Sequence, residues 1–243
     1  MFSIFKKKTS GVTDINWLGV DIHSHLLPGI DDGCKDVAES VSFIKRLQDL
    51  GFEKLICTPH IFTELYPNSS ETILPALKKV KDELVKQNVD IEIGAAAEYM
   101  IDEQFTIHPD LIALPGKHLL IEMSYLNEYP KIEQVIFDLQ IKGYSIILAH
   151  PERYNFYHQN YKSYQRLKDH GCIFQLNLLA ISGYYGKDVK RTAEYLLEHK
   201  LYDVAGTDLH SERHLGVLEK LVNSGKLFDL LGYYKFKNME LFN

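Results

Sequence analysis

Six apolar runs of this chain each end, on the carboxyl side, in a residue that can bind a metal ion. The runs finish at His23, His60, Glu98, Glu122, His150 and Asp208, and His25 and His210 lie two residues beyond the first and last of these. Parallel strands of a barrel present their carboxyl ends at one common rim, where active sites form. A buried charged group needs a partner of opposite charge. Imidazoles and carboxylates at so many strand ends therefore indicate that they share a bound cation. The pattern predicts a metal site at the carboxyl rim of an α/β barrel.

Strand-like and helix-like segments alternate along the chain, which predicts a parallel sheet with right-handed crossovers. Seven short runs, mostly apolar on both faces, are expected to be strands: 17–22, 54–58, 90–97, 118–123, 145–149, 172–178 and 203–207. Between them lie helix-period runs; the first opens with a capping box, Asp36-x-x-Glu39, and another follows Ser70. No linker or repeat interrupts the pattern. We therefore expect one domain over residues 17–243, preceded by an N-terminal extension of residues 1–16.

The charge balance and the cysteines narrow the class of protein. The 243 residues carry a formal net charge of −6, which disfavours a nucleic-acid partner because phosphate backbones bind basic surfaces. The three cysteines cannot all pair and form no C-x-x-C motif, which favours the reducing cytoplasm. No apolar signal segment follows the Lys6–Lys8 run, and no stretch reaches the roughly 18 apolar residues of a membrane span. We expect a cytoplasmic protein.

The segment Asp21–His25 carries the most specific local motif. In an extended backbone, residues two apart face the same side, so His23 and His25 can bind one ion. The turn that follows offers a carboxylate from Asp31 or Asp32, and the sequence does not separate the two. With the other strand ends, the predicted ligands are His23, His25, Asp32, His60, Glu98, Glu122, His150, Asp208 and His210. The alternative is that each is a satisfied capping or core group.

So many ligands exceed the need of a single ion and indicate a cluster of two or three metals, with Glu98 suited to bridge them. Mixed nitrogen and oxygen ligands without thiolate fit Mn²⁺, Fe²⁺/³⁺, Co²⁺ or Zn²⁺. Two of the five arginines, Arg153 and Arg213, lie three residues after His150 and His210. An arginine fork donates two parallel hydrogen bonds to a phosphate, so this placement predicts a phosphate clamp. The alternative for Arg213 is a surface cation at a helix start.

The strings H-S-H-L-L-P-G-I-D-D-G and A-H-P-E-R, with Thr58-Pro59-His60 and Asp208-Leu209-His210, resemble the polymerase-and-histidinol-phosphatase (PHP) superfamily. Within it the pattern is most similar to bacterial metal-dependent tyrosine-protein phosphatases of capsule and exopolysaccharide synthesis. The resemblance implies a distorted seven-stranded barrel with a trinuclear site, in which manganese is the metal most expected. One ion would take His23, His25, Glu98 and Asp208; a second Glu98, Glu122 and His150; a third Asp32, His60 and His210.

The resemblance implies hydrolysis of phosphotyrosine by a metal-activated hydroxide without a covalent phosphoenzyme, with Glu98, Arg153 and Arg213 as catalytic residues. The expected partner is the phosphotyrosine tail of a bacterial autophosphorylating kinase that controls polysaccharide synthesis and export. Membrane contact is expected only through that kinase. A cysteine-dependent phosphatase is excluded because no cysteine has an arginine six positions on.

Three alternatives stay open at this point. One is a small-molecule phosphatase of the same superfamily that acts on histidinol phosphate. A second is a metal-dependent nuclease or deaminase, which the acidic charge disfavours. The third is a metal-binding regulator that holds a kinase tail without cleaving it.

Overall fold

The computed structural model describes residues 11–243. Residues 1–10 of the expected extension, including Lys6–Lys8, lie outside the described residues. Ile15, from the remainder of the extension, is fully buried, and its backbone N–H donates to the Leu50 carbonyl at 2.8 Å. This part of the extension therefore packs on the domain.

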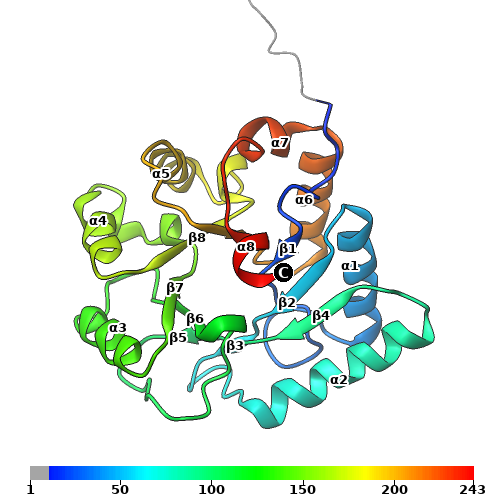
Figure 1. The fold of residues 1–243 in the computed structure, drawn as a ribbon, viewed down its shortest axis with the longest axis horizontal. Coiled ribbons are helices and arrows are strands. Elements are labelled where there is room, and N and C mark those ends of the chain that lie inside the picture. Colours follow the sequence, from blue (N-terminus) through cyan, green and yellow to red (C-terminus); the bar gives the residue numbers. More distant parts are fainter. Residues whose placement is uncertain (1–10) are drawn as a thin grey trace, which may run out of the picture.

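The strands form two sheets in which every ladder between named strands of the described chain is parallel. The smaller sheet has the order β1 (Val20–Asp21), β2 (Lys54–Cys57) and β4 (Glu92–Ala95). The larger has the order β3 (His60–Ile61), β5 (Glu98–Met100), β6 (His118–Glu122), β7 (Ser145–Leu148), β8 (Ile173–Asn177) and β9 (Val204–Gly206). The predicted α/β class with a parallel sheet is confirmed, and Figure 1 shows the sheet curled within a ring of helices.

Each of the seven expected runs contains one strand, and two further strands, β3 and β5, follow short breaks just beyond the expected ends of the runs 54–58 and 90–97. The first break follows β2 at Thr58-Pro59, and β3 continues the run at His60. The second separates β4 from β5 at Ala96-Ala97. Backbone hydrogen bonds cross the breaks: Ala96 N–H donates to the Cys57 carbonyl at 2.8 Å and Glu98 N–H to the Pro59 carbonyl at 3.1 Å.

Helices surround the strands (Figure 1). They are α1 (Val37–Asp49), α2 (Ser70–Lys86), α3 (Ile132–Ile141), α4 (Lys162–Asp169), α5 (Lys187–Glu198), α6 (Glu212–Asn223), α7 (Lys226–Leu231) and α8 (Asn238–Phe242), with short 3₁₀ turns at Pro115–Lys117 (η1), Pro151–Arg153 (η2), Asn155–Tyr157 (η3) and Ala180–Ser182 (η4). None of the helices in residues 11–243 is long and apolar enough to cross a membrane.

The helix starts differ in detail from the sequence prediction. Asp36 caps α1 by accepting from the Glu39 N–H at 2.9 Å, as expected, but the Glu39 carboxylate accepts from the Lys35 N–H instead of closing the box. The cap of α2 is Ser69, one residue earlier than expected, in a capping box with Thr72. Both caps satisfy helix N–H groups that have no partner within the helix.

A small apolar cluster fills the space enclosed by the strands. It contains Val20, Ile22, Ile56, Ala96, Leu114, Leu120, Ile147, Ala149, Val204 and Phe242. Phe242 comes from α8, which Figure 1 shows in the middle of the ring beside β1. The Asn238 side chain fixes this helix by donating to the carbonyls of Val20 and Ala205 and accepting from the Ala205 N–H. The amino end of the sheet is thus closed by apolar side chains, which leaves the carboxyl end for polar ones.

Candidate metal centre

The His23 and His25 side chains face each other, as the H-x-H spacing predicts. Their Nε2 atoms lie 3.3 Å apart, and both residues are fully buried. The turn after them gives the two aspartates different surroundings. Asp31 accepts from His25 Nδ1 at 2.8 Å and from the backbone N–H groups of Gly33 and His60, so it holds the His25 ring in place. Asp32 Oδ1 instead faces the cluster, 3.5 Å from His60 Nε2 and 3.6 Å from His210 Nε2.

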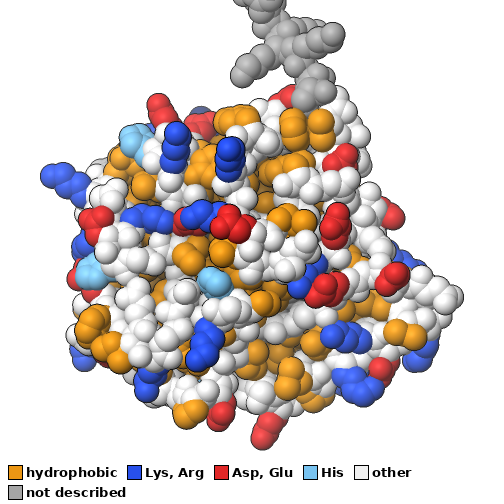
Figure 2. Space-filling model, viewed as in Figure 1, with side chains coloured by type: hydrophobic (Ala, Val, Ile, Leu, Met, Phe, Trp, Pro, Cys, Tyr) orange, Lys and Arg blue, Asp and Glu red, His pale blue; other side chains and the backbone are white. Residues whose placement is uncertain are grey.

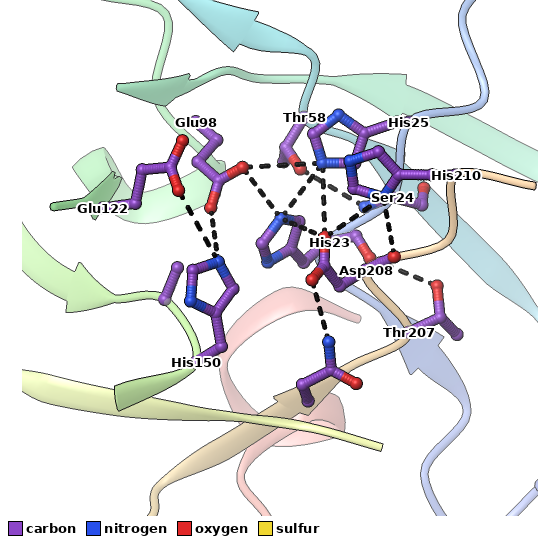
Figure 3. Close-up of polar contacts among 12 residues, drawn as sticks. His23, Ser24, His25, Thr58, Glu98, Glu122, His150, Thr207, Asp208 and His210 are labelled. Atoms are coloured by element: carbon purple, nitrogen blue, oxygen red, sulfur yellow. Dashed lines mark hydrogen bonds and ion pairs between the residues drawn. The ribbon is translucent and has the colours of Figure 1, made fainter. Parts of the chain in front are cut away.

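Figure 3 shows the Glu98 carboxylate, at the start of β5, joined by dashed lines to the imidazoles of His23, His25 and His150. Its Oε2 is 3.2 Å from His23 Nε2, 3.5 Å from His25 Nε2 and 3.1 Å from His60 Nδ1. Its Oε1 is 3.0 Å from His150 Nε2. The carboxylate is fully buried, and four imidazoles from three parts of the chain surround its charge.

The polar side chains form three overlapping groups whose geometry could hold a metal ion. They are His23, His25, Glu98 and Asp208; His60, Glu98 and Glu122; and His25, Asp32, His60 and His210, with ligand atoms within 4.8 Å of one another in each group. The first matches the predicted set. In the second, His60 takes the place expected of His150, whose Nε2 is 3.8 Å from Glu122 Oε2. All nine predicted ligands are therefore brought to one place.

Two of these residues hold an uncommon backbone conformation. His150 and Asp208 have φ of 32° and 50°, in the left-handed region that disfavours side chains other than glycine. Such conformations cost of order 1–3 kcal/mol and persist where the surroundings impose them. Here each bend turns a strand-end side chain toward the cluster.

Charge compensation holds the carboxylates ionised. Burial alone would raise the pKa of Glu98, but the neighbouring imidazoles, His23 first, lower this pKa well below its usual range. The same balance, led by His23, lowers the pKa of Asp208. Burial opposes protonation of His60, yet the Glu122 and Glu98 carboxylates raise its pKa to about 10. Metal ions would have to displace these imidazole protons, because only the neutral ring binds a metal.

The donor atoms fit a metal cluster. Glu98 Oε2 and His60 Nδ1 are both buried, and neither has a well-aligned hydrogen-bond partner within the described residues, although they lie 3.1 Å apart. Buried polar atoms without partners are costly, and a cation between them would satisfy both. Nitrogen and carboxylate oxygen without thiolate are ligands that Mn²⁺, Fe, Co²⁺ and Zn²⁺ accept.

A cavity of about 470 Å³ opens onto the cluster. Asp32, His60, Glu122, Asp208 and His210 line it, together with Phe62, Leu65, Tyr66, Met100, Tyr125, Arg153, Tyr185 and His214. The cavity therefore combines a polar base with partly aromatic walls. A larger cavity of about 810 Å³, between α5 and the α7–α8 segment, has none of the predicted ligands in its wall.

The two predicted arginines lie in different surroundings. The Arg153 guanidinium is held between the rings of Tyr125 and Tyr185, 4.5 Å and 4.4 Å from their centroids. Its Nη1 donates to Asp208 Oδ2 at 2.7 Å. Arg213 is exposed over the Tyr184 ring and does not line the cavity, whereas His214, its neighbour, does. The assignment of Arg213 as a phosphate clamp stays a prediction.

Sequence reasoning missed two buried amides beside the cluster. Gln175 Oε1 lies 3.1 Å from His23 Nδ1, and Asn177 Nδ2 donates to Asp208 Oδ2 at 2.8 Å. The sequence does contain a signal for them, because Gln175 and Asn177 are the two amide residues of an otherwise apolar strand and lie two positions apart, on the same face. Asp21 was likewise unassigned; it accepts from Thr207 Oγ1 at 2.6 Å and so ties β1 to β9.

Comparisons of sequence and of structure both match this chain to tyrosine phosphatases. Tyrosine-protein phosphatase YwqE of Bacillus subtilis is 30% identical over 91% of this chain and 90% of its own length. Tyrosine-protein phosphatase CpsB of Streptococcus pneumoniae is 29% identical over 79% of this chain and 83% of its own length. A solved structure from work on these two proteins, described as metal-dependent tyrosine phosphatases, has a TM-score of 0.77 and 28% identity, covering 91% of this chain and 93% of that chain.

The match to a protein family covers most of the folded chain. The family described as "Capsular polysaccharide synthesis, CpsB/CapC" matches residues 19–216, which span β1 to the first half of α6. All nine clustered residues fall inside this range. The chain belongs to the CpsB/CapC family.

Proposed function

We propose that this protein is a metal-dependent protein-tyrosine phosphatase. The observation that carries the proposal is the set of three ligand groups at the base of a partly aromatic cavity, in which any two groups have one residue in common: Glu98, His25 or His60. Two relatives named tyrosine-protein phosphatases match 91% and 79% of the chain. A phenyl phosphate needs a site of this kind: charge-neutralising groups at the bottom and apolar walls for the ring.

We propose the nine clustered residues as ligands of two or three ions, with manganese as the expected metal. When bound, such ions supply a Lewis acid that activates water and neutralises phosphate charge, so no covalent phosphoenzyme is needed. Glu98 would join neighbouring ions, and Asp31 would hold His25 with Nε2 toward them. Arg153, which lies close to two tyrosine rings at the wall of the cavity, would direct its free donors toward a phosphate oxygen.

We also propose that the two sheets form a single distorted seven-stranded barrel. Support comes from backbone hydrogen bonds that join the first and last runs: Asp208 N–H to the His23 carbonyl at 2.8 Å and His25 N–H to the Leu209 carbonyl at 3.0 Å. Counting β2 with β3 and β4 with β5 gives seven runs. A closed barrel brings all strand ends to one rim, which is where the ligands lie.

The substrate we propose is the phosphotyrosine tail of a bacterial tyrosine kinase of polysaccharide synthesis and export. Membrane contact would then occur only through the kinase. The net charge of −6 favours a partner other than nucleic acid. Figure 2 shows lysine and arginine side chains interspersed with acidic ones on the face that carries α8, so they form no continuous basic patch on that face. The unpaired, buried Cys34, Cys57 and Cys172 support a cytoplasmic location.

The test compares turnover of a phosphotyrosine peptide with turnover of histidinol phosphate, before and after chelation. We expect the peptide to be preferred, activity to be lost on chelation, and Mn²⁺ to restore it. Asp208→Ala should abolish turnover with the fold retained, whereas Asp188→Ala, at an exposed salt bridge on α5, should not. Preference for histidinol phosphate, or full activity after chelation, would contradict the proposal.

A further inference from the structure

The run that forms β8 is the one predicted strand run that ends in no predicted ligand. It carries Gln175 and Asn177 instead, both fully buried and on the same face of the strand. We propose that Gln175 and Asn177 are positioning residues that fix the ring orientation of His23 and the carboxylate orientation of Asp208 for metal binding. This inference rests on the proposed metal centre.

The orientation of the Gln175 amide is set by the backbone. The His150 N–H, which can only donate, points to Gln175 Oε1 at 3.1 Å, and Gln175 Nε2 donates to the Leu176 carbonyl at 2.7 Å. The oxygen of this amide therefore faces His23, whose Nδ1 lies 3.1 Å away. An acceptor at that distance requires a proton on His23 Nδ1. The lone pair of Nε2 is then directed to Glu98 and Asp208, where an ion would lie.

The Asn177 amide is fixed in the same way. The Leu179 N–H donates to Asn177 Oδ1 at 2.9 Å, so Nδ2 faces Asp208 Oδ2 at 2.8 Å. Arg153 donates to that same oxygen. With Oδ2 held by two donors, Oδ1 is the oxygen of Asp208 that faces the imidazoles, 3.3 Å from His23 Nε2.

The neighbouring strand leaves room for this arrangement. A Cβ atom on Gly206 of β9 would lie 2.8 Å from the Cβ of His23 and 3.1 Å from Gln175 Nε2. Its φ is not positive, so the glycine is required for space and not for backbone conformation. Gly206 thus lets Gln175 and His23 approach each other.

The test is a Mn²⁺ titration of the full-length chain after its metal has been removed, followed by calorimetry. We expect Gln175→Leu and Asn177→Leu to weaken Mn²⁺ binding by about 10- to 100-fold, the usual cost of losing a residue that orients a ligand. Gln175→Glu keeps an acceptor for His23 and for the His150 N–H but loses the donor to the Leu176 carbonyl, so its affinity should fall less than that of Gln175→Leu. Wild-type affinity in Gln175→Leu, or equal losses in Gln175→Leu and Gln175→Glu, would overturn the proposal.

Asn238→Leu is the matched control, because Asn238 is also a buried amide that bonds to backbone, but at the closed end of the sheet. It should lower stability and leave Mn²⁺ affinity unchanged. If Gln175→Leu does not fold, ¹⁵N spectra of the Zn²⁺-loaded wild type decide the point: His23 should carry its proton on Nδ1, and a proton on Nε2 would refute the inference. A wild-type chain that binds no Mn²⁺ would instead refute the metal centre itself.

Discussion

At the scale of single residues, Arg153 is held in place before any substrate arrives. Two tyrosine rings sandwich its guanidinium, and Asp208 accepts one of its hydrogen bonds, so its other donors have a fixed direction. The side chain is mostly buried, with 21% exposed at the cavity. A planar group fixed in this way can present two parallel donors, which an ammonium group cannot reproduce.

Arg153→Lys should therefore lower kcat/KM on a phosphotyrosine peptide by roughly 10- to 100-fold, the equivalent of about 1.5–3 kcal/mol for a lost hydrogen bond to a charged group. Steady-state kinetics would measure the loss. Arg191→Lys, at an exposed ion pair on α5, serves as the control and should leave kcat/KM unchanged. An Arg153→Lys enzyme as active as the wild type would remove Arg153 from its assigned role.

At the scale of elements, α8 contributes to stability at the end of the sheet that lies away from the proposed metal centre. This five-residue helix covers the amino end of the sheet, where Phe242 is only 1% exposed and packs in the apolar cluster inside the strands. Its ring also meets the His118 ring at the start of β6, with centroids 5.1 Å apart. The ligands of the proposed metal centre lie at the opposite ends of the strands.

Phe242→Ala should lower the free energy of unfolding by about 3–5 kcal/mol, because it removes a large buried side chain and leaves a cavity. Urea denaturation with a constant m-value would measure the change. The same substitution at Phe137, which is 54% exposed on α3, should cost no more than about 0.5 kcal/mol. A Phe242→Ala chain as stable as Phe137→Ala would show that α8 does not stabilise the amino end of the sheet.

The sequence predicts the parallel sheet and all nine clustered residues because strand periodicity and ligand chemistry are both local properties. The sequence does not predict the contacts of Gln175 and Asn177, because an amide in a strand has no distinctive chemistry until its partners are known. The choice between Asp31 and Asp32 depended on the course of a turn. The breaks after β2 and β4, and the short helix α8, come from packing between distant segments, such as Asn238 against Val20 and Ala205. Periodicity over so few residues does not reveal them.

At the scale of the whole molecule, the amino ends of the strands pack against apolar side chains, and the carboxyl ends carry the polar cluster. Six of the seven strand runs contribute one or two of the proposed ligands each, and Asp32 comes from the turn after the first run, so the proposed centre exists only when the complete fold has formed. Glu98 belongs to two of the three ligand groups and contacts four imidazoles. The number of ions bound should therefore depend on Glu98 more than on a residue in a single group.

The most direct measurement is the metal content of the purified chain by elemental analysis, paired with phosphotyrosine-peptide hydrolysis, for the wild type and for Glu98→Gln. This substitution keeps the size of the side chain but removes the charge that attracts and joins the ions. The account predicts two or three ions per wild-type chain, fewer in Glu98→Gln, and loss of hydrolysis with the lost metal. A metal-free wild type that hydrolyses the peptide, or a Glu98→Gln chain with full metal content and full activity, would contradict it.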